Sequence, residues 1–224
     1  YFSFIRYINK YMKIAILGSG GREHALAYAI SKSEKIKKIY CLPGNAGTED
    51  IAENIIIDTD NFKEVYEFLN KEKINLVIVG PEQPLVNGIV DFLEKCNVRV
   101  FGPNKIASQL EGSKIFTKNL CKKHSIPTAD FGVFENIEDS KNFLKSVNYP
   151  IVIKADNLAA GKGVYISKNF EEANLAVNEI FEGKFGIAKN ILIEEFLNGE
   201  EMSYFIISDG KTIKNFGTAQ DHKR

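Results

Sequence analysis

The sequence lacks the features that mark several broad classes of protein. Its 224 residues carry 29 basic and 29 acidic side chains, so zero net charge gives no support to binding of nucleic acid or of an acidic membrane surface. No apolar run approaches the roughly 18 residues of a membrane-spanning helix. Cys41, Cys96 and Cys121 lie far apart and match no metal or redox spacing. We therefore expect free thiols in a reducing cytoplasm, with no nucleic-acid or membrane partner.

What the chain does have, from Met12 to about Gly112, is an alternation of short apolar runs with helical patterns. Five runs have the composition of strands: 13–17, 36–42, 54–57, 74–79 and 98–101. Between most of them, apolar residues recur at spacings of three and four, as in Phe62, Val65, Tyr66 and Leu69, and again in Leu85, Ile89, Val90 and Leu93. This alternation predicts an α/β domain with a parallel sheet covered on both faces.

Glycine and proline cluster where these expected strands end. The clusters are Gly18–Gly21, Pro43–Gly47, Gly80–Pro84 and Gly102–Pro103. Because the carboxyl ends of parallel strands meet at one edge of the sheet, and ligands of such sheets bind there, the clusters predict a binding face.

After Gly112 the pattern changes to a mixture of helices and adjacent antiparallel strands. Ser113 is a candidate helix N-cap, and Pro127 follows the end of that helix. The expected elements are strands near 130–134, 151–155, 163–167, 190–196, 202–208 and 212–216, with helices near 136–147 and 170–182. This order predicts a second, α+β unit.

The Gly18–Gly21 turn follows the first strand and opens the first helix. Its backbone N–H groups can hold a phosphate, which the helix N-terminus also favours. A dinucleotide fingerprint would need glycine at position 23, which is Glu23, and an acidic residue ending the second strand, which ends in residues 40–44 without one. An NAD oxidoreductase is therefore disfavoured, whereas a tight turn without a ligand remains an alternative.

Two charged side chains accompany this turn. Arg22 can clamp a phosphate, and Glu82 can accept hydrogen bonds from sugar hydroxyls. Each residue taken alone is equally consistent with a solvated side chain or a helix cap, and His24 is interpreted as structural.

Basic and acidic groups in the second unit suit a nucleotide. Lys154 ends an apolar strand and precedes a small-residue loop that carries Lys162, although the spacing is not that of a Walker loop. Carboxylates in the segment 193–201 can take an adenine edge and ribose hydroxyls. A surface hairpin with solvated lysines and a solvated acidic cluster are the alternatives.

Taken together and in order, eight segments resemble the glycinamide ribonucleotide synthetase family of ATP-grasp ligases. They are residues 18–24, 43–48, 79–86, 101–103, 110–118, 151–164, 193–201 and 220–224. Asn157 departs from the family's glycine, but asparagine also tolerates positive φ. The resemblance implies an α/β fold: a Rossmann-like parallel-sheet domain at 12–112, then an incomplete α+β ATP-grasp domain at 113–224 with a lid at about 131–195. Residues 1–11 are expected to be an extension outside the family match.

The resemblance also implies a reaction. Glycine and 5-phosphoribosylamine would be joined at the expense of ATP through a glycyl phosphate, giving glycinamide ribonucleotide, ADP and phosphate in purine biosynthesis. Mg²⁺ would assist, with its ligands expected beyond residue 224 and none in this chain. The chain is therefore expected to be a fragment that is inactive alone, completed by a missing C-terminal portion, whether or not that portion is separately encoded.

Site residues follow from the same resemblance. The expected ATP-binding residues are Lys114, Lys154, Gly161, Lys162, Gly163, Glu194, Glu195, Leu197 and Glu201. The expected phosphoribosylamine-binding residues are Gly20, Gly21, Arg22, Asn45 and Glu82. The expected catalytic residues are Lys154, Asp221, Lys223 and Arg224, of which the last three would begin, with His222, a substrate-side loop.

Two further functions stay open from the sequence. One is a different ATP-grasp ligase, against which residues 20–24 and 220–224 argue. The other is a module that binds ATP or a sugar phosphate without catalysis, which the absence of metal ligands favours.

Overall fold

The computed structural model describes residues 11–156, 163–186 and 188–222. Contacts within the chain divide it into two compact units after Ile126, and a short segment that begins at Asp156 belongs to the first unit. The domain boundary at residue 112 remains a prediction.

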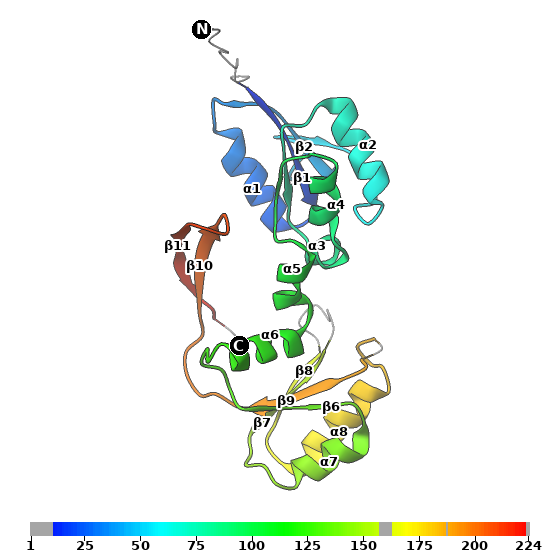
Figure 1. The fold of residues 1–224 in the computed structure, drawn as a ribbon, viewed down its shortest axis with the longest axis vertical. Coiled ribbons are helices and arrows are strands. Elements are labelled where there is room, and N and C mark those ends of the chain that lie inside the picture. Colours follow the sequence, from blue (N-terminus) through cyan, green and yellow to red (C-terminus); the bar gives the residue numbers. More distant parts are fainter. Residues whose placement is uncertain (1–10, 157–162, 187, 223–224) are drawn as a thin grey trace. The chain divides into compact units, whose positions relative to one another are not determined.

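The first unit is built on a five-stranded parallel sheet in the order β3-β2-β1-β4-β5 (Figure 1). Its strands are β1 (Met12–Gly18), β2 (Ile36–Pro43), β3 (Glu53–Asn54), β4 (Leu76–Val79) and β5 (Val100–Phe101). The chain moves from β1 outward through β2 and β3, then returns to place β4 on the other side of β1. The predicted parallel sheet is confirmed, and the reversal of direction lies between β1 and β4.

Helices cover both faces of this sheet, as Figure 1 shows. On one face Ala27 of α1 (Gly21–Ser31) packs against Ile14, Ile16 and Ile39. On the other face α2 (Phe62–Glu72) and α4 (Ile89–Lys95) bury Val65, Leu69 and Leu93 against the strands. The central strand β1 is buried from Ile14 to Gly18 because helices lie above and below it.

The helical pattern through Leu85 and Leu93 forms two helices rather than one. Gly88, with φ of 99°, ends α3 (Glu82–Asn87) and precedes α4, because only glycine adopts this left-handed conformation without strain. The helix α5 (Lys105–Gly112) was not predicted, although its N-cap Asn104 accepts a hydrogen bond from the Ala107 amide at 2.9 Å. The helix α6 (Lys114–Lys123) begins at Ser113, as predicted.

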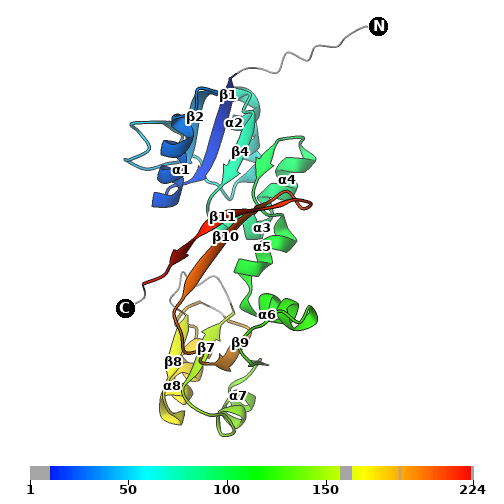
Figure 2. The same cartoon turned by 90° about the vertical axis from the view of Figure 1, so that its left-hand side faces the viewer.

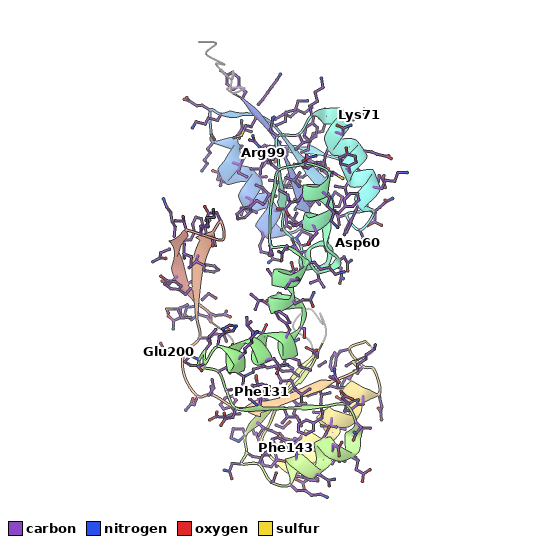
Figure 3. The ribbon with its side chains drawn as sticks, viewed as in Figure 1. Asp60, Lys71, Arg99, Phe131, Phe143 and Glu200 are labelled. Carbon is purple, nitrogen blue, oxygen red and sulfur yellow. The ribbon has the colours of Figure 1, made fainter. Side chains whose placement is uncertain are left out.

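The second unit contains a four-stranded sheet in the order β6-β9-β7-β8, whose neighbours pair antiparallel. The strands are β6 (Phe131–Phe134), β7 (Ile151–Ala155), β8 (Val164–Ser167) and β9 (Ile191–Glu195). Two helices, α7 (Ile137–Leu144) and α8 (Phe170–Phe181), bury one face of the sheet. Phe143 of α7, labelled in Figure 3, packs on Phe134 with ring centroids 4.9 Å apart.

The last two strands form a separate two-stranded sheet. β10 (Met202–Ser208) and β11 (Ile213–Gln220) pair antiparallel with each other, and Figure 2 shows them running side by side. Their apolar side chains are exposed, and Phe216 is the most exposed of them. In the part of the chain that the structure describes, no helix has the length and apolar character to cross a membrane.

Candidate functional site

The first candidate site lies between β1 and β4, where the order in which strands are added to the sheet reverses. β1 and β4 are neighbours, and the Gly18–Gly21 turn and the connection at Gly80 leave their carboxyl ends. The Gly80 amide donates to the Leu17 carbonyl at 3.1 Å, and the Gly44 amide donates to the Gly18 carbonyl at 3.1 Å. Three of the glycine clusters found in the sequence therefore meet at one edge, which is where ligands of open α/β sheets bind.

Arg22 and Glu82 face each other across this edge. The Arg22 Nη2 donates to Glu82 Oε1 at 2.7 Å, which joins the first turn of α1 to the first residue of α3. The guanidinium lowers the pKa of the Glu82 carboxyl below its usual range, and the carboxylate raises the pKa of Arg22 in turn. Their side chains are 70% and 40% exposed, so both groups remain open to a ligand.

Asn45 supports the turn from the second strand. Its Nδ2 donates to the carbonyls of Ser19 at 2.9 Å and Gly20 at 3.2 Å, and its Oδ1 accepts from the amides of Gly47 and Thr48. Because both ends of this amide already bond to the backbone, the structure shows Asn45 holding the turn, and its contact with a substrate stays a prediction.

Glu23 belongs to this site although no role was predicted for it. Its side chain is buried, and Oε2 accepts from the Gly20 amide at 2.6 Å. The sequence showed only that a carboxylate stands where a dinucleotide fingerprint has glycine. The sequence could have indicated this contact, because a glutamate three residues after the N-cap forms half of a capping box by accepting from the N-cap amide.

Asp156 is a second residue that sequence reasoning missed. Its carboxylate accepts from the Ser113 hydroxyl at 3.0–3.1 Å and from the Ile115 amide at 3.1 Å, at the start of α6. It therefore fixes the first turn of the helix that carries Lys114, and a carboxylate is stabilising at a helix N-terminus. Asp156 lies in the segment 151–164 that resembles the ligase family, and this position could have indicated a role for it.

The second candidate site lies on the four-stranded sheet. Lys154 of β7 and Glu194 of β9 form an ion pair on the sheet face opposite α7 and α8. Lys154 is 28% exposed and Glu194 is 6% exposed. A lysine near the end of a buried strand has to be solvated or paired, because unpaired burial of a charge is costly, and here the carboxylate of Glu194 is the partner. A partly open ammonium held by a buried carboxylate can approach an anionic phosphate from the solvent side.

Strand alternation separates the two predicted adenine-pocket carboxylates. Glu194 and Glu195 are consecutive in β9, so their side chains point to opposite faces of the sheet. A pocket on the Lys154 face would therefore use the Glu194 side chain and only the backbone of Glu195. Leu197 lies exposed after β9, and Glu201 directly precedes β10.

The remaining predicted residues divide between described and undescribed parts of the chain. The Gly163 carbonyl accepts from the Ala155 amide at 2.9 Å, and the Asp221 amide donates to the Glu201 carbonyl at 3.0 Å. Asp221 and His222 follow β11 at the surface. Gly161, Lys162, Lys223 and Arg224 lie outside the described residues.

No metal centre forms among the described residues. Within residues 11–156, 163–186 and 188–222, no group of three or more histidine, cysteine, aspartate or glutamate side chains is placed to hold a metal ion. These residues therefore supply no fit for Mg²⁺.

The fold and the two sites define a class of protein. A parallel sheet whose reversal point carries a glycine turn is followed by an antiparallel sheet with a lysine–glutamate pair, and the family model that matches the second part of the chain identifies the class as ATP-grasp. Two family models match almost the whole chain: phosphoribosylglycinamide synthetase, N domain, at residues 12–111, and phosphoribosylglycinamide synthetase, ATP-grasp (A) domain, at residues 112–224. The chain belongs to the phosphoribosylglycinamide synthetase family.

Relatives support this membership. The chain is 50% identical over 214 residues to phosphoribosylamine–glycine ligase of Mesorhizobium japonicum and 46% identical over 217 residues to that of Escherichia coli. Each match covers 95% of this chain but 50% and 51% of the relative. The chain thus spans about half the length of the curated relatives it matches.

Solved structures support the fold. The crystal structure of phosphoribosylamine–glycine ligase from Thermotoga maritima matches with a TM-score of 0.75 and 33% identity, over 91% of this chain and 48% of that one. N5-carboxyaminoimidazole synthetase from Staphylococcus aureus in complex with ADP also gives a TM-score of 0.75, over 96% of this chain and 56% of that one. At 18% identity the latter is evidence for the fold alone.

Proposed function

We propose that this chain carries the phosphoribosylamine site and part of the ATP site of a phosphoribosylamine–glycine ligase. The observation that carries the proposal is the Arg22–Glu82 pair, whose polar atoms lie 2.7 Å apart beside the Gly18–Gly21 turn at the reversal point of the sheet. Family membership and half-length coverage of named ligases support the same assignment.

The proposed reaction needs no enzyme nucleophile. The glycine carboxylate attacks the γ-phosphorus of ATP, ADP leaves, and an acyl phosphate forms. The amine of 5-phosphoribosylamine then attacks the acyl carbon, the amide bond forms, and phosphate leaves with the electrons of the broken C–O bond. Catalysis therefore depends on positioning the reactants and on cationic groups that neutralise the transferring phosphoryl group.

In the first unit, residues of the turn and its neighbours would hold 5-phosphoribosylamine. The Gly21 backbone and the Arg22 guanidinium would bind the 5-phosphate, since helix N-termini and arginine both favour phosphate oxygens. The Gly20 amide, which was predicted for the same role, already donates to Glu23 Oε2 at 2.6 Å, so Gly20 would contribute the shape of the turn. Glu82 uses Oε1 for Arg22, which leaves Oε2 to accept from a ribose hydroxyl. Asn45 would keep the turn in the shape that binds the phosphate.

In the second unit, Lys154 would hold an ATP phosphate while Glu194 orients the ammonium. Lys114 of the first unit and the loop residues Gly161, Lys162 and Gly163 are further predicted contacts of the ATP phosphates, and Glu195, Leu197 and Glu201 would serve adenine and ribose. Asp221, Lys223 and Arg224 would face the acyl phosphate. Mg²⁺ is expected to be held by residues outside this chain, and three free cysteines support a cytoplasmic location.

Separate titrations of the 224-residue chain test the two sites. Ribose 5-phosphate should shift the backbone amide NMR signals of Gly21 and Arg22 and leave that of Ile193 in place. An ATP analogue should shift Ile193 and leave Gly21 in place. If ribose 5-phosphate shifted only amide signals of the second unit, the assignment would be overturned.

A binding module without catalysis is the second candidate, favoured because no group of three or more histidine, cysteine, aspartate or glutamate side chains among the described residues is placed to hold a metal ion. Both candidates predict that the 224-residue chain alone does not carry out ligation, and glycine-dependent ADP release, with phosphoribosylamine generated in situ, tests that expectation. The chain of 224 residues should show no release on the per-second scale of a typical enzyme. Turnover on that scale would mean that these residues hold the complete ligase site.

A further inference from the structure

The glycines of the first site do not all serve the ligand. We propose that Glu23 is the positioning residue of this site, that Gly20 and Gly80 are glycines because they make room for it, and that Gly21 is the glycine at which the ligand approaches. The statement about Gly21 rests on the proposed function, whereas the statement about Glu23 rests on packing.

Glu23 is buried to an extent that is rare for a carboxylate. It is 4% exposed, and Oε2 accepts from the Gly20 amide at 2.6 Å. Oε1 is buried and has no hydrogen-bond partner among the residues that the structure describes. Burial of a charged group without full compensation is costly, so this side chain is held in place by its surroundings.

Those surroundings are glycines from two different connections. A Cβ atom added to Gly18 would lie 2.7 Å from Glu23 Cγ, one added to Gly20 would lie 2.8 Å from Oε2, and one added to Gly80 would lie 2.1 Å from Oε1. All three separations are far below the roughly 3.5–4.0 Å at which non-bonded carbon atoms are most stable. Any side chain at these positions would therefore compete with Glu23 for its space, and Gly18, whose φ is 121°, also needs glycine for its backbone conformation.

Gly21 differs from its neighbours in the turn. A Cβ atom added there would meet nothing within 4 Å, so no part of the described protein requires glycine at this position. Gly21 is also the first residue of α1, where the backbone N–H has no partner within the helix. Absence of a side chain at an exposed helix start permits close approach of a phosphate to the backbone.

Glu23 thereby contacts both connections that form the site, the one from β1 to α1 and the one from β4 to α3, where it lies against Gly80. Arg22, which precedes Glu23, and Glu82, two residues after Gly80, form the ion pair across the same edge. In a dinucleotide fingerprint, glycine at the position of Glu23 lets helix and strand pack closely. Here the carboxylate fills that space and Gly80 provides the room.

A double-mutant cycle on the 224-residue chain tests the packing. Gly80→Ala should lower the Tm of the first unit by roughly 5 °C or more. The same substitution in a Glu23→Ala background should lower it by less than about half as much, because the obstructing carboxylate is gone. If Gly80→Ala alone fails to fold, recovery on adding Glu23→Ala supports the inference. Equal losses in both backgrounds, or no recovery, would overturn it.

Ribose 5-phosphate binding tests the positioning role. Gly21→Ala should keep the wild-type Tm and weaken binding at least about tenfold. Glu23→Ala should also weaken binding, whereas Glu23→Gln should stay within about threefold, because its amide oxygen still accepts from the Gly20 amide. Wild-type affinity in Gly21→Ala or in Glu23→Ala would contradict the inference. No binding by the unsubstituted chain would overturn the proposed function and the role of Gly21, and the cycle would still decide the packing role of Glu23.

Discussion

The two units each present one ion pair at their candidate site, and the pairs differ in burial. Arg22 and Glu82 are 70% and 40% exposed, whereas Glu194 is 6% exposed and Lys154 is 28% exposed. An exposed pair contributes little to stability because water screens it, but a buried pair is costly to break because one charge stays behind. A pair of one basic and one acidic side chain therefore serves a different purpose in each unit.

Because of this difference in burial, substitutions at the first site are expected to affect ligand binding alone, whereas those at the second site also affect folding. In the first unit the backbone turn is shaped by Glu23 and Asn45, so Arg22 and Glu82 can exchange partners when a ligand binds. In the second unit the ammonium that would meet a phosphate is also part of the packed sheet. A substitution there is expected to affect folding and binding together.

The largest expected effect is that of Lys154→Ala. This change leaves the Glu194 carboxylate buried without its ammonium partner, and we expect it to destabilise the second unit by about 2–4 kcal/mol, toward the lower end of what broken buried pairs cost. Native-state hydrogen exchange at the Ile193 amide measures the change. The exposed Lys189→Ala is the matched control and should have an effect within about 0.5 kcal/mol. Equal exchange rates of the Ile193 amide in the two variants would show that Lys154 does not stabilise the second unit.

Arg22→Ala should instead act on binding. Loss of one charge-assisted contact of about 1.5–3 kcal/mol corresponds to a roughly 10- to 150-fold weaker affinity for ribose 5-phosphate, with little change in stability. Calorimetric titration measures it. Arg99→Ala is the control, since this exposed arginine, labelled in Figure 3, precedes β5 at the amino end of the strand. Similar losses in both variants would indicate a general charge effect.

The sequence predicted both sites from local signals and missed what depends on distant pairing. Apolar runs gave most strands within one or two residues, because each run carries its own alternation. The break at Gly88 was missed because the apolar spacing continues through it. The Lys154–Glu194 pair depends on the register of β7 against β9, and the burial of Glu23 depends on Gly80, 57 positions later, so neither was visible in any short segment.

The smallest expected effect is the pH dependence of the exposed pair. The pKa of Glu82 lies below its ordinary value of 4.5 in the folded chain. Its stabilising contribution is therefore complete above about pH 4.5 and is lost as the pH falls through the lowered value. The contribution should stay below about 1 kcal/mol, because both side chains are more than a third exposed. Urea unfolding of wild type and Glu82→Gln between pH 3 and 6 should converge at the acid end, and a constant difference across that range would contradict the pairing.

The contrast between the two pairs is tested most directly by one pair of double-mutant cycles read by hydrogen exchange on the same chain. Lys154→Met with Glu194→Gln is followed at the Ile193 amide, and Arg22→Ala with Glu82→Gln is followed at the Leu17 amide. We predict a coupling free energy above about 2 kcal/mol for the buried pair and below about 0.5 kcal/mol for the exposed pair. Equal couplings, or a larger one for Arg22 and Glu82, would contradict the division between a structural and an exchangeable ion pair.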